Sequence, residues 1–267
     1  MLNDSPASGP RKIYTALEAR AALEYPLWTL SAPLLRNLPS GDGHPVLVLP
    51  GFTAADRSTV PLRRFLRSLG YRTYGWKLGP NLGPTPHVVD GLSERLESIV
   101  ERNDRAISIV GWSLGGIFGR ELARDHPDSV RQVITLGSPI RMQPGDRSAA
   151  SALWDSLSDI HDPDAIERMM NLNRSPMTVP TTSVYSRSDG IVHWKTCLQP
   201  KGFIAENVEV FGSHCGLGFN PSAAMVIADR LAQPEGQWRR FRPPIWARSA
   251  FPRPANVKPL NIDQAAA

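Results

Sequence analysis

The feature that most constrains this chain is a serine framed by glycines, within residues 110–116. Residues 106–110 are a short β-branched run that is typical of a buried strand, and residues 116–124 have the pattern of a helix that ends near Pro127. Between them the chain matches G-x-S-x-G around Ser113. Glycines allow a sharp turn from strand to helix, which leaves the serine hydroxyl projecting above the sheet. The pattern therefore predicts a nucleophilic serine in a tight strand–turn–helix.

Strand and helix patterns alternate along most of the 267 residues. Apolar or β-branched runs predict strands at residues 45–49, 71–76, 106–110, 130–136, 181–185 and 208–211. Helical patterns predict helices at residues 60–69, 88–102, 116–124 and 221–231. This alternation predicts an α/β fold with a mainly parallel sheet and right-handed crossovers.

The segments that depart from this rhythm divide the chain into parts. Residues 1–39 are expected to form an N-terminal helical flap that Pro26 and Pro33 interrupt, with a lipid-seeking helix as the alternative. Residues 40–232 form the predicted α/β domain. Within it, residues 141–178 are an insertion rich in Met and Trp, which we interpret as a lid, or else a plain surface excursion. Residues 233–267 are a Pro- and Arg-rich tail expected to wrap the domain.

A serine becomes a working nucleophile when a base takes its proton and a third group holds that base. Asp189 follows a predicted strand in an Asp-Gly turn, and His214 lies in a glycine-rich loop after the next strand. Parallel sheets place their sites at the carboxyl ends of strands, so Ser113, Asp189 and His214 are predicted to converge there as a catalytic triad. The other histidines are expected to be solvated surface groups: His44, His87, His126, His161 and His193.

Acyl transfer also needs donors for the oxyanion. The backbone N–H of Leu114, directly after the nucleophile, is one expected donor, and the N–H of Phe52, in the loop after residues 45–49, is the other. Trp112, Trp154 and Met170 indicate a hydrophobic substrate pocket.

Composition and cysteine content bear on the expected partners, compartment and disulfide bonding of the protein. Lys and Arg exceed Asp and Glu by 30 to 25, but no aromatic-interleaved nucleic-acid motif accompanies the excess, so no nucleic-acid partner is expected. Contact with a membrane surface is left open without support. No secretory signal is visible, which favours the cytoplasm unless a leader has been removed. A bond between Cys197 and Cys215 would tie the acid loop to the histidine loop, and the sequence leaves open whether it forms.

Four segments together resemble the bacterial esterase/lipase group of the α/β-hydrolase superfamily, over roughly residues 44–232. They are LPGF at 49–52, GWSLGG at 111–116, YSRSDGIV at 185–192 and GSHCGLG at 212–218. The resemblance implies an α/β-hydrolase fold and cleavage of a small-molecule or lipid carboxylic ester through an acyl-serine, with no cofactor and no metal. One departure is Pro50-Gly51, where many members carry His-Gly.

Other uses of the same triad stay open at this point: a thioesterase, an acyltransferase or an amidase. A non-catalytic binding module on the same scaffold is a further alternative. The residues set neither the length of the acyl group nor the oligomeric state.

Overall fold

Six parallel strands form the centre of the computed structural model, which describes residues 9–143, 145–172, 176–200 and 202–255. The strands are β1 (Pro45–Leu49), β2 (Arg72–Gly75), β3 (Ile107–Trp112), β4 (Val130–Leu136), β5 (Thr181–Tyr185) and β6 (Ala205–Glu209). Their order across the sheet is β2-β1-β3-β4-β5-β6, and every neighbouring pair is parallel. The predicted α/β class with a mainly parallel sheet is confirmed.

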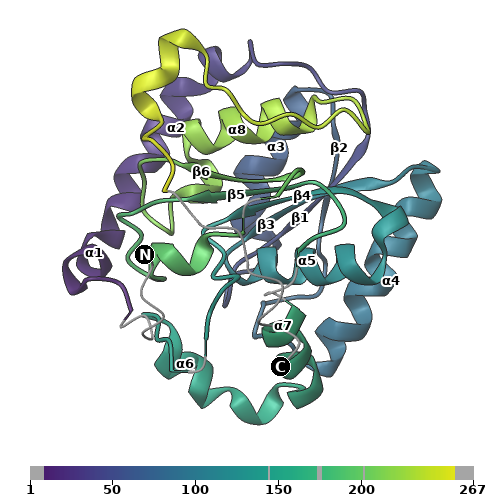
Figure 1. The fold of residues 1–267 in the computed structure, drawn as a ribbon, viewed down its shortest axis with the longest axis vertical. Helices are drawn as coiled ribbons and strands as arrows, with labels where there is room; N and C mark the ends of the chain where they lie inside the picture. Colours follow the sequence, from purple (N-terminus) through teal and green to yellow (C-terminus); the bar gives the residue numbers. More distant parts are fainter. Residues whose placement is uncertain (1–8, 144, 173–175, 201, 256–267) are drawn as a thin grey trace.

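Helices cover both faces of this sheet (Figure 1). They are α1 (Lys12–Ala16), α2 (Ala21–Leu35), α3 (Val60–Ser68), α4 (Pro86–Asn103), α5 (Leu114–Asp125), α6 (Ser151–Ser156), α7 (Pro163–Leu172) and α8 (Pro221–Leu231). Short 3₁₀ turns join several of them, including one at Leu17–Arg20 between α1 and α2.

The strands divide their side chains between two hydrophobic cores because successive residues of a strand point to opposite faces. Val46 and Val48 pack with the apolar sides of α2, α3 and α8. Leu47 and Leu49 pack with α4 and α5 on the other face. A strand covered on both sides is apolar throughout, which is why residues 45–49 form a continuous hydrophobic run.

The position of one strand and the continuity of one helix differ most from the sequence prediction. The last strand lies at Ala205–Glu209 rather than at 208–211, because its pairing with β5 begins at Ala205 opposite Thr181. Helix α2 runs through both Pro26 and Pro33, which we expected to break it. Trp28 and Leu35, on the inner side of this helix, are buried in the core, and their packing offsets the loss of the backbone hydrogen bonds that the prolines cannot donate.

The insertion and the tail both lie against the α/β core. The described part of the insertion forms a loop followed by α6 and α7, which lie at the bottom of Figure 1. The tail packs beside β5 and β6: the N–H of Phe241 donates to Glu206 at 2.9 Å, and that of Ala255 donates to the Tyr185 hydroxyl at 2.7 Å. Residues 256–267 lie outside the described part of the chain. No helix among the described residues has the length and hydrophobicity needed to cross a bilayer.

The close packing of β3 against α5 can be tested by substitution at Gly111. A Cβ at Gly111 would lie 2.3 Å from the Cα of Gly116 and 2.4 Å from the Gly115 carbonyl oxygen, both backbone atoms of α5. We expect Gly111→Ala to lower the free energy of unfolding by about 1–3 kcal/mol, since strand and helix must separate. Urea denaturation measures this change.

Gly236→Ala is the control for the backbone cost of replacing a glycine. Gly236 has a positive φ, of 76°, whereas Gly111 does not, and a Cβ at Gly236 meets nothing within 4 Å. Gly236→Ala therefore reports backbone strain without overlap, about 1–2 kcal/mol, and Gly111→Ala reports overlap without that strain. A Gly111→Ala variant as stable as the wild type would contradict the close packing.

Candidate active site

Ser113 occupies a strained turn between β3 and α5. Its φ is 53° and its ψ is −123°, a conformation that non-glycine residues rarely adopt. The Ser113 N–H donates to the Leu136 carbonyl at 2.8 Å, which anchors the turn on β4. A Cβ at Gly115 would lie 2.6 Å from the carbonyl oxygens of Leu49 and Pro50, so only glycine fits there. This is the sharp strand–turn–helix that the G-x-S-x-G pattern predicts.

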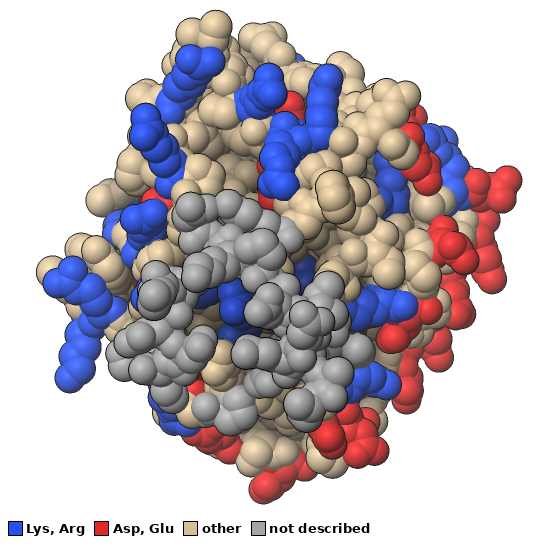
Figure 2. Space-filling model, in the orientation of Figure 1, with Lys and Arg blue, Asp and Glu red and all other residues tan. Residues whose placement is uncertain are grey.

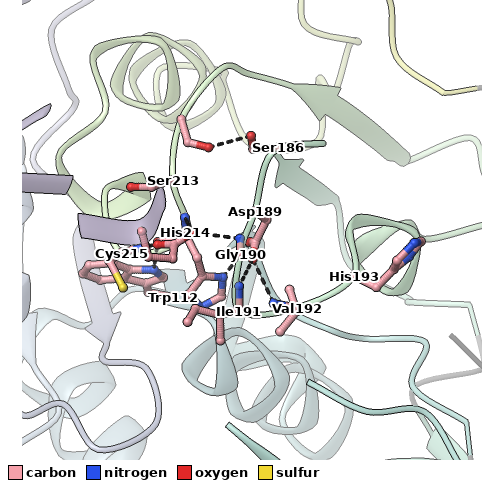
Figure 3. Close-up of polar contacts among 12 residues, drawn as sticks. Trp112, Ser186, Asp189, Gly190, Ile191, Val192, His193, Ser213, His214 and Cys215 are labelled. Atoms are coloured by element: carbon pink, nitrogen blue, oxygen red, sulfur yellow. Dashed lines mark hydrogen bonds and ion pairs between the residues drawn. The ribbon is translucent and has the colours of Figure 1, made fainter. Parts of the chain in front are cut away.

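Asp189 and His214 meet at the same edge of the sheet (Figure 3). Asp189 Oδ2 lies 2.6 Å from His214 Nδ1. The other oxygen, Oδ1, accepts the N–H groups of Ile191 at 2.9 Å and Val192 at 2.8 Å, which holds the carboxylate in place. Both side chains are buried. Because Asp189 contacts Nδ1 of His214, the Nε2 atom of the ring remains available for other contacts.

Ser113 and His214 line one cavity of about 620 Å³. No hydrogen bond joins the Ser113 hydroxyl to the imidazole in the described structure. Bonds between nucleophile and base are often long without substrate and tighten when it binds. The structure therefore brings the three predicted side chains to one place, with the acid–base contact formed and the serine in the same cavity.

The two expected oxyanion donors also line this cavity. Among the described residues, neither the N–H of Phe52 nor that of Leu114 has a hydrogen-bond partner; the latter begins α5, where free N–H groups are normal. The loop of Phe52 lies close to Ser113: a Cβ at Gly51 would be 3.1 Å from the Ser113 Cβ.

Asn81 fixes the loop that carries Phe52, a role that the sequence analysis missed. Its side-chain amide donates to the Pro50 carbonyl at 2.8 Å, and its backbone carbonyl accepts the Thr53 N–H at 2.7 Å. Asn81 is fully buried. The Gly-Pro-Asn-Leu-Gly-Pro run marked this segment only as a loop, so no sequence signal distinguished Asn81.

The cavity walls are mainly apolar, and the insertion supplies much of them. Trp112, Trp154 and Met170, the predicted pocket residues, all line it. The Trp154 ring packs on Phe52 with 5.4 Å between centroids and on His161 with 4.4 Å. The insertion therefore closes over the loop that holds the expected oxyanion donor.

The N-terminal segment braces the acid and histidine loops, which the sequence did not reveal. Glu18 Oε1 accepts the N–H groups of Gly190 at 2.8 Å and His214 at 2.9 Å, while Oε2 accepts that of Cys215 at 2.9 Å. Glu24 accepts both the N–H and the hydroxyl of Ser213, at 2.9 and 2.8 Å. The N-terminal segment thus holds both the loop of Asp189 and the loop of His214.

The Glu18 and Asp189 carboxylates affect the pKa of His214. Burial raises the pKa of Glu18, but the hydrogen bonds from three backbone N–H groups together outweigh this effect. The net pKa therefore lies below its ordinary value, and Glu18 is charged. Burial lowers the pKa of His214, yet the charges of Asp189 and Glu18 and the bond to Asp189 raise it above the ordinary 6.5. The imidazole is therefore a stronger base than a free histidine.

The two cysteines are both free in the structure, so the disulfide that the sequence left open is not formed there. Cys197 is buried and Cys215 exposed. Burial and the neighbouring Glu18 carboxylate raise the pKa of Cys215 to about 12.

A second aspartate–histidine–serine arrangement lies away from the cavity. His44 Nδ1 is 2.5 Å from Asp42 Oδ1, and its Nε2 is 2.9 Å from the Ser108 hydroxyl. His44 and Ser108 are fully buried, and neither lines the cavity, so no substrate reaches that hydroxyl. We interpret it as a structural hydrogen-bond network. The expectation that His44 and His161 are solvated is wrong, since both are buried against hydrogen-bond partners.

No group of three or more His, Cys, Asp or Glu side chains suited to a metal ion occurs among the described residues.

Comparisons with known proteins support the fold. No protein-family model matches the chain. The chain is similar to lipase B of Aspergillus fumigatus (TM-score 0.57, 16% identity, 74% of this chain and 55% of that one). It is also similar to the monoacylglycerol lipase of Paleococcus ferrophilus (TM-score 0.54, 17% identity, 73% and 96%) and to the α/β-hydrolase enzyme MGS-MChE2 from a lagoon-sediment metagenome (TM-score 0.52, 16% identity, 71% and 90%).

The chain has the α/β-hydrolase fold. In sequence, it is 26% identical over 98 residues to the pimeloyl-(acyl-carrier protein) methyl ester esterase of Shewanella woodyi. That match spans 37% of this chain and 37% of the relative.

The contacts of Glu18 lead to a prediction about the pH dependence of this candidate site. Because its negative charge raises the pKa of His214, Glu18→Gln is expected to lower that pKa. The neutral base then becomes available at lower pH, so the acid limb of the pH profile of kcat/KM moves to lower pH. An NMR titration of the imidazole measures the same shift without turnover.

Glu24→Gln is the matched control, because Glu24 holds Ser213 but does not contribute to the pKa of His214. It should leave the acid limb in place. A folded Glu18→Gln protein with an unshifted His214 titration would contradict an electrostatic effect of Glu18.

Cys215 generates a reactivity prediction. The thiolate is the reactive form, so its raised pKa should make Cys215 react with iodoacetamide near neutral pH much more slowly than an ordinary exposed thiol. Glu18→Gln should accelerate the reaction, and denatured protein should give two alkylated cysteines. Peptide mass spectrometry follows each site. Alkylation of native Cys215 at the rate of a free thiol would refute the prediction.

Proposed function

We propose that this protein is a serine hydrolase that cleaves carboxylic esters through an acyl-serine intermediate, with Ser113, His214 and Asp189 as its triad. The observation that carries the proposal is the 2.6 Å contact between Asp189 and His214 at the cavity that Ser113 also lines. The lipase and esterase names of the similar proteins support the same chemistry.

In the proposed cycle, the Ser113 Oγ attacks the ester carbonyl carbon while His214 Nε2 takes its proton. Asp189 holds the ring in the tautomer with Nδ1–H and stabilises the imidazolium. The negative oxygen of the tetrahedral intermediate accepts the N–H groups of Phe52 and Leu114. His214 then protonates the departing alcohol, and the same residue activates a water molecule that releases the acid and restores the serine.

The cavity favours an ester with an apolar group. Its walls include Phe52, Trp112, Trp154, Met169 and Met170, and burial of an apolar chain against such side chains is favourable. Methionines adapt to chains of different shape. We therefore place the acyl or alcohol chain of the substrate beneath the insertion, which acts as a lid over it.

Hydrolysis of a series of p-nitrophenyl esters tests the proposal. Ser113→Ala should lower kcat/KM by roughly 10⁴- to 10⁶-fold, because the nucleophile is lost. It should also abolish labelling by a fluorophosphonate. The acyl length with the highest kcat/KM measures the extent of the apolar pocket.

Two serines provide controls. Ser58 lines the same cavity, and Ser58→Ala should keep activity close to that of the wild type. Ser108→Ala removes the hydroxyl of the buried His44 network, and any folded protein should keep fluorophosphonate labelling. Labelling that survives in Ser113→Ala, or that disappears in Ser108→Ala, would refute the assignment of the nucleophile.

A further inference from the structure

Helix α2 carries a row of leucines whose side chains are largely exposed. Leu23, Leu27, Leu30 and Leu34 are 72%, 56%, 76% and 45% exposed. Their spacing of four, three and four residues places them on one side of the helix. We call these four residues the leucine ridge. Single exposed apolar side chains are ordinary on a protein surface, but an aligned row marks a binding surface.

The charges of this N-terminal segment divide by sign. Glu18 and Glu24, the acidic residues of its described part, face inward and bind the loops of Asp189 and His214. Arg11, Lys12 and Arg36 are exposed. The outer surface of the segment is therefore apolar and basic. Figure 2 shows basic side chains along the left and top of this view, with acidic side chains gathered on its right.

A groove of about 600 Å³ lies between α2 and α3. It borders one edge of the exposed side of α2, and the leucine ridge borders the other. Arg36, Arg57 and Arg64 line it together with Tyr25 and Phe65. No acidic residue is among its described lining, and the three guanidinium groups have no hydrogen-bond or ion-pair partner in the described part of the chain. A guanidinium fork fits phosphate oxygens in two parallel hydrogen bonds.

The spacing along α2 places these two features on opposite flanks of its exposed side. Tyr25, Thr29, Ala32 and Arg36 form the row on the groove side. Pro26 and Pro33 lie exposed between this row and the leucine ridge. A helix lying in the plane of a bilayer surface would bury the ridge at the edge of the acyl chains and present the arginines to the headgroups.

We propose that α2 and the groove beside it dock the protein on a bilayer that contains anionic phospholipids. The leucine ridge enters the interface, and Arg36, Arg57 and Arg64 bind lipid phosphates. Charge complementarity selects this occupant, because two copies of this chain meeting through the same surface would bring their arginines together. Docking also places the segment that holds the acid and histidine loops beside a source of apolar esters.

Vesicle co-sedimentation tests the proposal on the full chain carrying Ser113→Ala, so that binding is measured without turnover. We expect binding to vesicles of phosphatidylcholine with phosphatidylglycerol, and much weaker binding to phosphatidylcholine alone. Added salt should weaken the binding. Arg36→Gln, Arg57→Gln and Arg64→Gln together should reduce the partition coefficient on the order of 100-fold, from roughly fivefold per arginine. Leu27→Ser with Leu30→Ser should also reduce it.

Matched control variants remove the same number of basic or apolar side chains at other exposed positions. Lys77→Gln, Arg102→Gln and Arg168→Gln change the net charge equally at other exposed positions, and Phe203→Ser with Ile245→Ser removes two other exposed apolar side chains. Both sets should bind vesicles better than the corresponding α2 and groove variants.

Two results would overturn the proposal. One is that the protein with the unchanged surface and the variants of α2 and the groove bind anionic vesicles equally well, or that neither binds them. The other is a dimer in light scattering that Leu27→Ser with Leu30→Ser dissociates, since the ridge would then join two copies. Failure of ester hydrolysis would leave this measurement unaffected, because lipid binding is read directly.

Discussion

The structure depends on how closely β3, α5 and the loop after β1 approach one another. Gly111 and Gly115 permit backbone atoms to touch where any Cβ would overlap them. That contact holds Ser113 in a conformation with positive φ and points its side chain into the cavity rather than into the sheet. It also brings Phe52 and Leu114 to the same cavity, so the packing around the turn places both expected oxyanion donors at its wall. The strain at one residue is balanced by the packing of three elements.

The positions of Asp189 and His214 depend on a different part of the chain. Asp189 and His214 lie on neighbouring loops after parallel strands, and Glu18 joins those loops by accepting one N–H from the first and two from the second. A buried carboxylate is costly unless donors surround it, and here backbone groups supply them. The same charge that braces the loops raises the basicity of His214. The N-terminal flap is therefore part of the electrostatics of the site.

The proposed lipid surface and the site share the N-terminal segment. The inward side of this segment presents Glu18, from the turn before α2, and Glu24, from α2, to the loops. The outward side of α2 presents the leucine ridge, with Arg36 at its end. Helical periodicity allows this division, since side chains on opposite sides of a helix meet different environments. The insertion with α6 and α7 closes the cavity from another direction, through the contact of Trp154 with Phe52.

Local patterns in the sequence determined the fold class and the predicted triad, because those signals are short-range: the β-branched runs, the glycines around Ser113, the Asp-Gly turn at 189 and the glycine-rich loop at 214. Most strands were predicted within two residues for the same reason. Long-range contacts decided the rest. Glu18 meets His214 across nearly 200 positions, and Asn81 meets Pro50 across 31, so neither partner is visible in a sequence window. The burial of His44 and the continuity of α2 through two prolines were likewise decided by tertiary packing, which overrides local preference wherever a neighbouring element supplies the missing bond or contact.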